Sequence, residues 1–291
     1  IAEQRRQKLR AIREQHIAPY PPRYHRSHTA SEAVARFKRG DETPMSLAGR
    51  ITALRIMGKA AFCDLRDSSG KVQAYFSNKL LGDKYDSLHH LDIGDIIGVE
   101  GRMFRTRTGE VTVEVSAFTM LCKSLRPLPE KWHGLTDVEK RYRQRYLDLI
   151  ADEDIGRIFK MRSRLITAAR YMERQGFIEV ETPVLHPVAG GALAQPFVTH
   201  HHALDRDLYL RIATELYLKR VIIGGFDKVF EVGRIFRNEG ISTRHNPEFT
   251  MMESYQAYAD YNDVMALLED MVSSVARRVL RKTKVTFGGE A

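Results

Sequence analysis

Cysteine is scarce in this sequence, and long apolar runs are missing. Two cysteines, Cys63 and Cys122, occur in 291 residues, which is too few for a disulfide framework, and their spacing does not match a metal site. We expect both to be reduced thiols in a cytoplasmic protein. No segment approaches the roughly 20 apolar residues of a membrane-spanning helix. The charged start at Ile1, which we expect to be trimmed, contains no secretory signal.

An acidic excess is also missing. The sequence has 46 Lys and Arg residues against 37 Asp and Glu residues, which gives a net charge of +9. This balance fits a polyanionic partner such as nucleic acid, although many basic proteins never bind RNA. The length predicts two domains, and the hydrophobic content of 43% is enough to build their cores.

Short alternating segments dominate residues 45–124. Five stretches of alternating apolar and polar residues are separated by turn sequences such as DSSG and RTG. They predict a small closed barrel, with the OB-fold as the leading candidate. Such barrels bind single-stranded nucleic acid by stacking bases on aromatic rings over a basic groove. Phe62 is a candidate, with Arg50, Arg55 and Lys59 nearby, although a barrel phenylalanine more often belongs to the core.

Helical patterns flank the barrel. Residues 1–44 contain a basic helical segment stopped by PYPPR and a second short helix closed by Gly40. The first segment is either a solvated surface helix or a helix that follows an RNA backbone. Residues 125–150 carry prolines and then dense charge, which predicts a linker that passes into a helix. We expect its Trp132 to pack between domains.

Residues 151–291 predict a second domain. Apolar residues recur at helical spacing over 154–175 and Gly176 caps this helix, after which FIEVETPVL predicts a strand that ends at proline. The segment LYLRIATELYLKR predicts a strand and then a helix, with Thr214 as its cap and Glu215 in its first turn.

The stretch 228–255 predicts a two-stranded hairpin joined by the polar segment 240–244. Side chains on a strand point to alternate faces, so Phe230, Val232 and Phe236 share an apolar face. The opposite face holds charged residues. If the charged faces of the two strands coincide, one surface is lined by Arg237, Glu239, Phe249, Glu253 and Tyr255.

The residue types on this surface suit a nucleotide and an amino acid. A guanidinium is a planar fork for phosphate oxygens, and an aromatic ring can stack on a base. Two carboxylates beside a tyrosine hydroxyl suit a cationic amine. A surface hairpin laced with salt bridges would use the same residue types and is the competing interpretation.

The string FRNEGISTRHNPEFTMMESYQAYADY closely resembles motif 2 of class II aminoacyl-tRNA synthetases, in the form found in bacterial-type lysyl-tRNA synthetases. The resemblance extends along essentially the whole chain, including the PLP-x-K-x-HGL-x-D run. It implies an α+β multidomain protein with an N-terminal OB-fold β-barrel and an incomplete class II antiparallel sheet flanked by helices. The implied parts are a helical extension (1–44), an anticodon-binding OB-fold domain (45–124), a linker (125–150) and the N-terminal part of the catalytic domain (151–291).

The resemblance also implies the chemistry and the residues that perform it. Members of this family activate lysine with ATP to lysyl-adenylate and transfer the lysine to the 3′ end of its tRNA. The implied catalytic residue is Arg237, which bridges the substrate carboxylate and the α-phosphate. The implied ATP-binding residues are Arg237, Asn238, Glu239, His245, Asn246 and Phe249. The implied lysine-binding residues are Gly191, Glu215, Glu253 and Tyr255, and the implied anticodon-binding residues are Phe62, Gln73 and Glu110.

The family pattern is incomplete in this sequence. The helix, strand and proline of residues 154–183 resemble class II motif 1, which implies a homodimer. A third motif, with its arginine for the γ-phosphate and its acidic Mg²⁺ ligands, does not occur before Ala291. We therefore expect the chain to be part of a longer synthetase, with the Mg²⁺ ligands in the missing C-terminal part.

Other functions stay open. Without the third motif, a tRNA-binding module without catalytic activity is the main alternative. A synthetase for aspartate or asparagine is a minor alternative, which HNPEFTMMESY and the two glutamates argue against. The lysyl-transferase paralogues that modify a translation factor lack the barrel, so residues 45–124 argue against them.

Overall fold

A computed structural model describes the chain except for residues 42, 130–134, 243 and 287–291. The chain divides into two compact units, Ile1–Glu153 and Asp154–Ala291. The predicted packing role of Trp132 concerns a residue outside the described part. None of the helices in the described ranges is both long enough and apolar enough to span a membrane.

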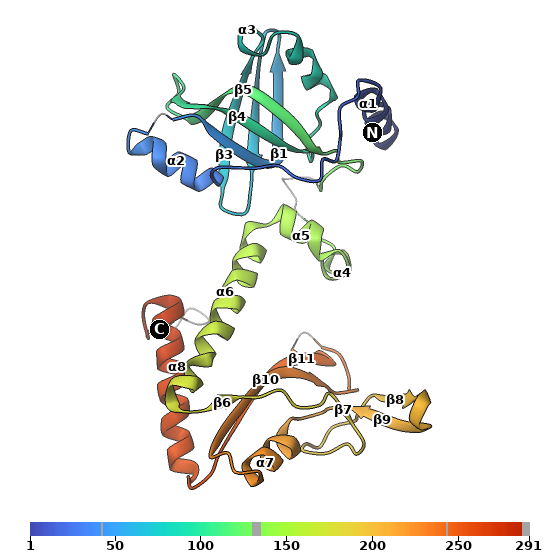
Figure 1. The fold of residues 1–291 in the computed structure, drawn as a ribbon, viewed down its shortest axis with the longest axis vertical. Helices are drawn as coiled ribbons and strands as arrows, with labels where there is room; N and C mark the ends of the chain where they lie inside the picture. The colour runs from blue at the N-terminus through green and yellow to red at the C-terminus, as the bar shows by residue number, and fades with distance from the viewer. Residues whose placement is uncertain (42, 130–134, 243, 287–291) are drawn as a thin grey trace. The chain divides into compact units, whose positions relative to one another are not determined.

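The first unit is built on a five-stranded closed barrel (Figure 1). Its strands are β1 (Met45–Met57), β2 (Ala60–Arg66), β3 (Lys71–Ser77), β4 (Ile96–Arg105) and β5 (Val111–Cys122). They close in the order β1-β2-β3-β5-β4, with β3 and β5 parallel and the other pairs antiparallel. Alternate residues along β2 and β3 are buried, as the sequence pattern requires. The predicted OB-fold barrel is confirmed.

The barrel interior is apolar and contains one of the two thiols. Leu47, Ile51, Leu65 and Phe76 are almost completely buried there. Cys63 lies among them as a free thiol, and burial raises its pKa. The short helix α3 (Asn78–Leu81) and the 3₁₀ segment η1 (Gly82–His90) follow β3 and close one end of the core.

Two N-terminal helices belong to the same unit. Helix α1 (Ala2–Glu14) buries Leu9 and Ile12. Its Arg5 donates hydrogen bonds to three main-chain carbonyls of the barrel unit, those of Ile93 at 2.9 Å, Ser124 at 3.1 Å and Arg126 at 3.0 Å. The helix is therefore docked through a buried arginine and through Lys8, whose Nζ lies 2.8 Å from Asp92 Oδ1, whereas Arg6, Arg10 and Arg13 are exposed.

Helix α2 (Ala30–Lys38) begins with a capping box. The Thr29 hydroxyl accepts the Glu32 N–H, and the Glu32 carboxylate accepts the Thr29 N–H. These bonds lower the pKa of Glu32. The helix ends before Gly40, whose φ of +86° confirms the predicted closing glycine.

A buried ammonium joins the last barrel strand to the turn before β4. Lys123 has a fully buried side chain, and its Nζ lies 2.7 Å from Asp95 Oδ2 and 2.5 Å from Asp92 Oδ2. Asp95 is also fully buried. Burial raises the pKa of Asp92, but hydrogen bonds from Lys123 and Lys8 outweigh it, so the net shift is downward.

Two short helices follow the described part of the linker. Helix α4 (Val138–Arg143) and helix α5 (Arg145–Ala151) are held together by Asp148, which pairs with Arg141 at 2.9 Å and also with Arg145. The prediction that the charged end of the linker becomes helical is confirmed.

The second unit contains two small sheets and flanking helices (Figure 1). The first sheet has the order β11-β10-β6, from β6 (Ile178–Glu179), β10 (Lys228–Phe236) and β11 (Glu248–Gln256). The second has the order β7-β9-β8, from β7 (Leu185–His186), β8 (Val198–His201) and β9 (Arg206–Leu210). The remaining elements are α6 (Glu153–Ala169), η2 (Arg170–Gln175), η3 (His202–Leu204), α7 (Glu215–Ile223) and α8 (Tyr261–Leu280).

The hairpin of β10 and β11 has the predicted register. Ile235 pairs with Phe249, Glu231 with Glu253 and Val229 with Tyr255, so the odd-numbered residues share one face. On the other face Phe230 packs with Met172 and Phe177, and with residues of α8. The predicted coincidence of the odd-numbered faces of the two strands is confirmed, but the face of Phe230 also carries Arg234 and Glu248, which pair at 3.4 Å.

Three local predictions need correction. FIEVETPVL is not one strand: β6 pairs with β10 over two residues, and the Thr182 N–H then bonds to the Glu231 carboxylate at 3.2 Å. Thr214 occupies the N-cap of α7, but its side chain makes no capping bond within the described chain. The connection of the hairpin spans 237–247 rather than 240–244, so Arg237 and Glu239 lie beyond the end of β10.

We predict that Lys123→Met destabilises the barrel by about 3 kcal/mol, because the buried Asp95 carboxylate loses the cation it faces. Urea unfolding monitored by circular dichroism measures this change. The matched control is Lys71→Met, since Lys71 is 53% exposed and lies 3.3 Å from Asp64. We expect the control to change stability by less than about 1 kcal/mol, and equal effects of the two variants would contradict the prediction.

Candidate functional site

A buried ion pair forms the base of the site in the second unit. Arg211 follows β9, and its Nη1 lies 2.5 Å from Glu231 Oε1 with both side chains 4% exposed. Arg211 also donates to the carbonyls of Thr182 at 3.1 Å and Arg234 at 2.8 Å. The Glu231 carboxylate in turn accepts the Thr182 hydroxyl at 2.6 Å. Arg211 Nε and Nη1 and both oxygens of the Glu231 carboxylate are therefore engaged, as burial of charge requires.

Gly233 makes room for this pair. A Cβ at this position would overlap the Arg211 guanidinium and would lie 2.9 Å from Glu231 Oε1. Because Gly233 has no side chain, the Arg211 guanidinium can lie directly against this face of β10.

Arg237, just beyond the end of β10, meets Phe249 on β11. The Arg237 guanidinium carbon lies 5.4 Å from the centre of the Phe249 ring, within the range of a cation–π contact. Arg237 Nε donates to the Ile212 carbonyl at 3.3 Å, and the Arg237 N–H bonds to the Pro247 carbonyl at 2.8 Å. Within the described part of the chain, the two Nη groups of Arg237 have no hydrogen-bond acceptor. The Arg237 guanidinium is thus held in place through its Nε, while its two Nη groups remain available to a ligand.

The four predicted lysine-binding residues come together. Glu253 Oε1 accepts the Thr214 N–H at the start of α7 at 3.2 Å, and the Tyr255 hydroxyl lies 3.4 Å from Glu253 Oε2. Gly191 has a φ of +91°, and a Cβ there would lie 3.2 Å from the Cβ of Glu215. We name Gly191, Glu215, Glu253 and Tyr255 the carboxylate cluster.

The electrostatic potential at the carboxylate cluster is negative. The pKa of Tyr255 is raised by burial first and then by the charges of Glu253 and Glu215. A phenol whose ionisation is opposed in this way stays a hydrogen-bond donor or acceptor without charge. The two carboxylates and the hydroxyl together therefore favour a cationic ligand.

The other predicted ATP-binding residues lie in the connection of the hairpin. Asn238, Glu239, His245 and Asn246 are all exposed. His245 Nδ1 lies 2.8 Å from the Ser242 hydroxyl, and the Asn246 amide donates to the Glu248 carbonyl at 3.0 Å. Among the described residues, no side-chain hydrogen bond or ring contact joins these four to Arg237 or Phe249. The structure places them near the end of the hairpin and does not assemble them around a nucleotide.

A second candidate site lies on the barrel. Phe62 on β2 is 5.1 Å from Tyr75 on β3, measured between ring centres, and Tyr75 is 6.0 Å from Phe104 on β4. These rings, with Gln73, Arg55 and Arg107, line a cavity of about 550 Å³. Half-buried rings beside arginines are the arrangement that stacks unpaired bases. The predicted neighbours Phe62 and Gln73 are thus brought together.

The remaining predicted barrel residues differ in position. Gln73 Oε1 accepts the Thr112 hydroxyl at 3.0 Å, which fixes the amide. Glu110 is exposed at the turn before β5, and its side chain does not line the cavity of Phe62. Arg55 lines that cavity, whereas Lys59 is exposed on the turn between β1 and β2.

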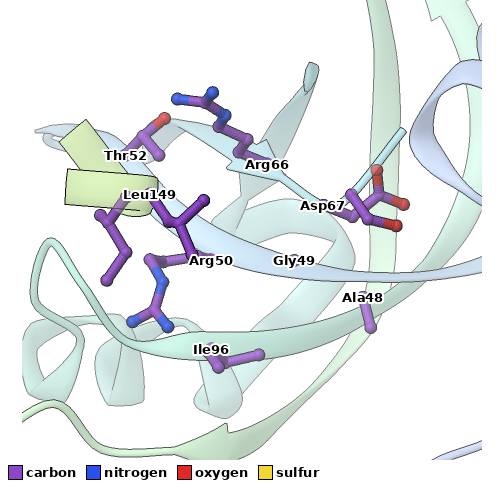
Figure 2. A pocket seen from close by; sticks show the side chains of 10 residues that line it. Ala48, Gly49, Arg50, Thr52, Arg66, Asp67, Ile96 and Leu149 are labelled. Atoms are coloured by element: carbon purple, nitrogen blue, oxygen red, sulfur yellow. The ribbon is translucent and has the colours of Figure 1, made fainter. Parts of the chain in front are cut away.

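Arg50 is not part of the aromatic site, contrary to the expectation. It pairs with Arg66 across β1 and β2, and it donates to the Gly94 carbonyl at 2.8 Å. Figure 2 shows its side chain beside a separate cavity of about 360 Å³, which Arg66 and Leu149 also line. The β-bulge between Ile51 and Ala53 leaves both arginines on the outer surface of the barrel, because Ile51 before it and Leu54 and Ile56 after it pack on the core. Arg50 is therefore separated from the aromatic site by its position along the 13 residues of β1.

The described residues do not fit a metal site. No group of three or more His, Cys, Asp or Glu side chains in the described ranges could hold an ion.

Sequence reasoning missed two features of these sites. Arg211 was not selected, although an arginine inside the apolar run LYLRIA is a signal for a buried ion pair. Tyr75 and Phe104 were not selected either, although both alternate with core residues on their strands in the same way as Phe62.

Two family models match the chain. Residues 137–288 match the tRNA synthetases class II (D, K and N), and residues 45–121 match the OB-fold nucleic acid binding domain. The first match covers more than half of the chain. The chain therefore belongs to the class II tRNA synthetases of the D, K and N group.

Individual relatives narrow the resemblance to one member of that group. The chain is 54% identical over 291 residues to the lysine–tRNA ligase of Carboxydothermus hydrogenoformans, which covers 99% of this chain and 60% of the relative. It is 57% identical over 293 residues to that of Dehalococcoides mccartyi, covering 98% and 59%. It is 52% identical over 297 residues to that of Staphylococcus epidermidis, covering 98% and 60%. The chain thus spans about 60% of the length of these curated relatives.

We predict that Gly233→Ala destabilises the second unit by at least about 2 kcal/mol, because the new Cβ displaces Arg211 from Glu231. Chemical denaturation measures the change. Gly156→Ala is the matched control, since Gly156 lies inside α6 and a Cβ there meets nothing within 4 Å. We expect the control to gain about 0.5–1 kcal/mol of stability. A neutral Gly233→Ala variant would show that the pair tolerates displacement.

Proposed function

We propose that this chain carries the lysine- and tRNA-recognition parts of a lysine–tRNA ligase. Such an enzyme activates lysine with ATP to lysyl-adenylate and transfers it to the 3′ end of its tRNA. The observation that supports this most directly is the carboxylate cluster, where Glu215, Glu253 and Tyr255 lie together at the start of α7. An acidic side chain would need a cation in the same place, and a neutral side chain would bring no positive charge to the two carboxylates.

The chemical step that we propose needs positioning rather than a covalent nucleophile. The carboxylate of lysine attacks the α-phosphate of ATP, a carboxylate–phosphorus bond forms, and pyrophosphate leaves with the electrons of the broken bond. Two anions must approach each other, and negative charge is redistributed as the bond breaks. Arg237 suits both needs, because its free fork can contact the lysine carboxylate and an α-phosphate oxygen at once.

We assign the remaining nucleotide contacts to the hairpin. Phe249 offers a ring for stacking adenine, and Asn238, Glu239, His245 and Asn246 are the candidates for its edge and for the phosphates. Support comes from their exposure beside the end of the hairpin. They would adjust on binding, as exposed connections often do.

We assign anticodon recognition to the aromatic site of the barrel. Phe62 would stack on an anticodon base, Gln73 would read the edge of the central base, and Glu110 is the third candidate. The three adjacent rings and the neighbouring arginines support this assignment. The fixed amide of Gln73 supports readout of one base edge, because its Nε2 stays free while its oxygen is engaged.

We also propose a cytoplasmic homodimer that uses Mg²⁺. Free thiols support a reducing compartment. Exposed apolar residues of the motif 1 helix, such as Phe159 at 52% and Leu165 at 45%, support a dimer interface. The Mg²⁺ ligands are assigned to sequence that the relatives have in addition to the matched length.

A tRNA-binding module without catalysis is the second candidate. It is supported by the aromatic site of the barrel, whose lining residues all lie in the first unit. Lysine-dependent exchange of pyrophosphate into ATP distinguishes the two candidates, with the other amino acids as controls. Exchange with lysine alone supports the ligase, and no exchange combined with tRNA binding supports the module.

We predict that Glu253→Gln lowers the rate of lysine-dependent pyrophosphate exchange by at least about 100-fold. The amide keeps an acceptor for the Thr214 N–H but removes the charge that would pair with an amine. Binding of tRNA, measured by filter retention, should not change. Normal lysine activation by this variant would contradict the assignment of the carboxylate cluster.

We predict the opposite pattern for Phe62→Ala. Loss of one stacking ring should weaken tRNA binding by about 1–3 kcal/mol, while the affinity for lysine stays unchanged. The same filter assay and exchange assay test both statements. If tRNA binding is unaffected while the barrel stays folded, the aromatic site is not the anticodon site.

A further inference from the structure

Lys219 brings an ammonium group of the protein itself to the carboxylate cluster. It lies one turn after Glu215 on α7, and its Nζ is 2.5 Å from Glu215 Oε1. The same Nζ is 6.0 Å from the centre of the Tyr255 ring. Lys219 thus touches two of the four residues that define the cluster, and nothing in the proposed function gives it a role.

The two carboxylates of the cluster differ in their hydrogen-bond partners. Glu253 is engaged with the Thr214 N–H and the Tyr255 hydroxyl. Within the described residues, Lys219 is the one hydrogen-bond partner of the Glu215 carboxylate. The Glu215 side chain is 31% exposed and that of Lys219 is 55% exposed, so the pair is open to exchange with solvent and ligands. Pairs of this exposure are weak and break easily.

We propose that Lys219 is an internal competitor of the substrate: its ammonium occupies Glu215 in the free protein and leaves when a cationic amino acid binds. This inference rests on the proposed function. A primary ammonium on a four-carbon stem is the group that the side chain of lysine also carries, so one ion pair replaces another of the same kind.

If Lys219 were a positioning residue, its mutation would change the affinity for lysine in the opposite direction. If Lys219 only oriented Glu215 for the substrate, its removal would weaken lysine binding. If it competes, its removal makes lysine binding tighter, because no internal ammonium has to be displaced. The direction of the change therefore separates a competitor from a positioning residue.

The test is calorimetric titration of the 291-residue protein with L-lysine near neutral pH, comparing wild type with Lys219→Met and Lys219→Arg. We expect the methionine variant to bind lysine roughly two- to fivefold more tightly, as the weakness of an exposed ion pair allows. The arginine variant keeps the charge and should stay within about twofold of wild type. The binding of ATP, titrated separately, should not change in either variant.

The matched control is Lys71→Met in the barrel, because Lys71 is 53% exposed and pairs with Asp64 in the other unit. It should leave the affinity for lysine unchanged. Unchanged or weaker lysine binding by Lys219→Met, with normal binding by wild type, would overturn the inference alone. Failure of wild type to bind lysine would overturn the proposed function, and the inference with it.

Discussion

The pairing of Arg211 with Glu231 is the constraint on which the second unit depends. Both groups are buried, and a buried charge is tolerated only when a partner and hydrogen bonds replace the lost water. The pair links the end of β9, the chain at Thr182 and the middle of β10. Three segments that are distant in sequence are thus fixed by one polar contact rather than by a large apolar core.

The ion pair of Arg211 and Glu231 also reduces the repulsion that acts on Glu253 in the carboxylate cluster. Glu231 and Glu253 are direct cross-strand partners on one face of the hairpin, an arrangement that is unfavourable for like charges. Arg211 neutralises Glu231, so the repulsion is reduced and the charge of Glu253 is left for a ligand. The helix N-terminus at Thr214 stabilises that charge further through a backbone N–H. An anionic site is therefore maintained without a second buried arginine.

The sequence predicted most of the elements and fewer of the contacts. Alternation was sufficient for the five barrel strands and for the two faces of the hairpin, because residue period and burial are directly linked. FIEVETPVL alternates equally well, yet it forms only a two-residue strand, because tertiary contacts of Thr182 with Glu231 replace the ladder. Likewise Thr214 has the right residue type for a cap, but its hydroxyl makes no capping bond among the described residues, and its own N–H bonds to the Glu253 carboxylate. The roles proposed for Glu253 and Phe62 rest on family resemblance, whereas the contacts of Arg211 and Lys219 became apparent only in the folded structure.

Strand β10 has an outer edge that β6 covers for only two residues. Beyond that point the Arg211 side chain donates to the Arg234 carbonyl, and the Arg211 carbonyl accepts the Phe236 N–H at 3.0 Å. One residue thus satisfies edge groups that a longer neighbouring strand would otherwise pair. Unpaired strand edges are templates for association with other chains. The arginine therefore protects this sheet from edge-to-edge aggregation, so its loss would affect the solubility of the folding chain as well as the charge of the site.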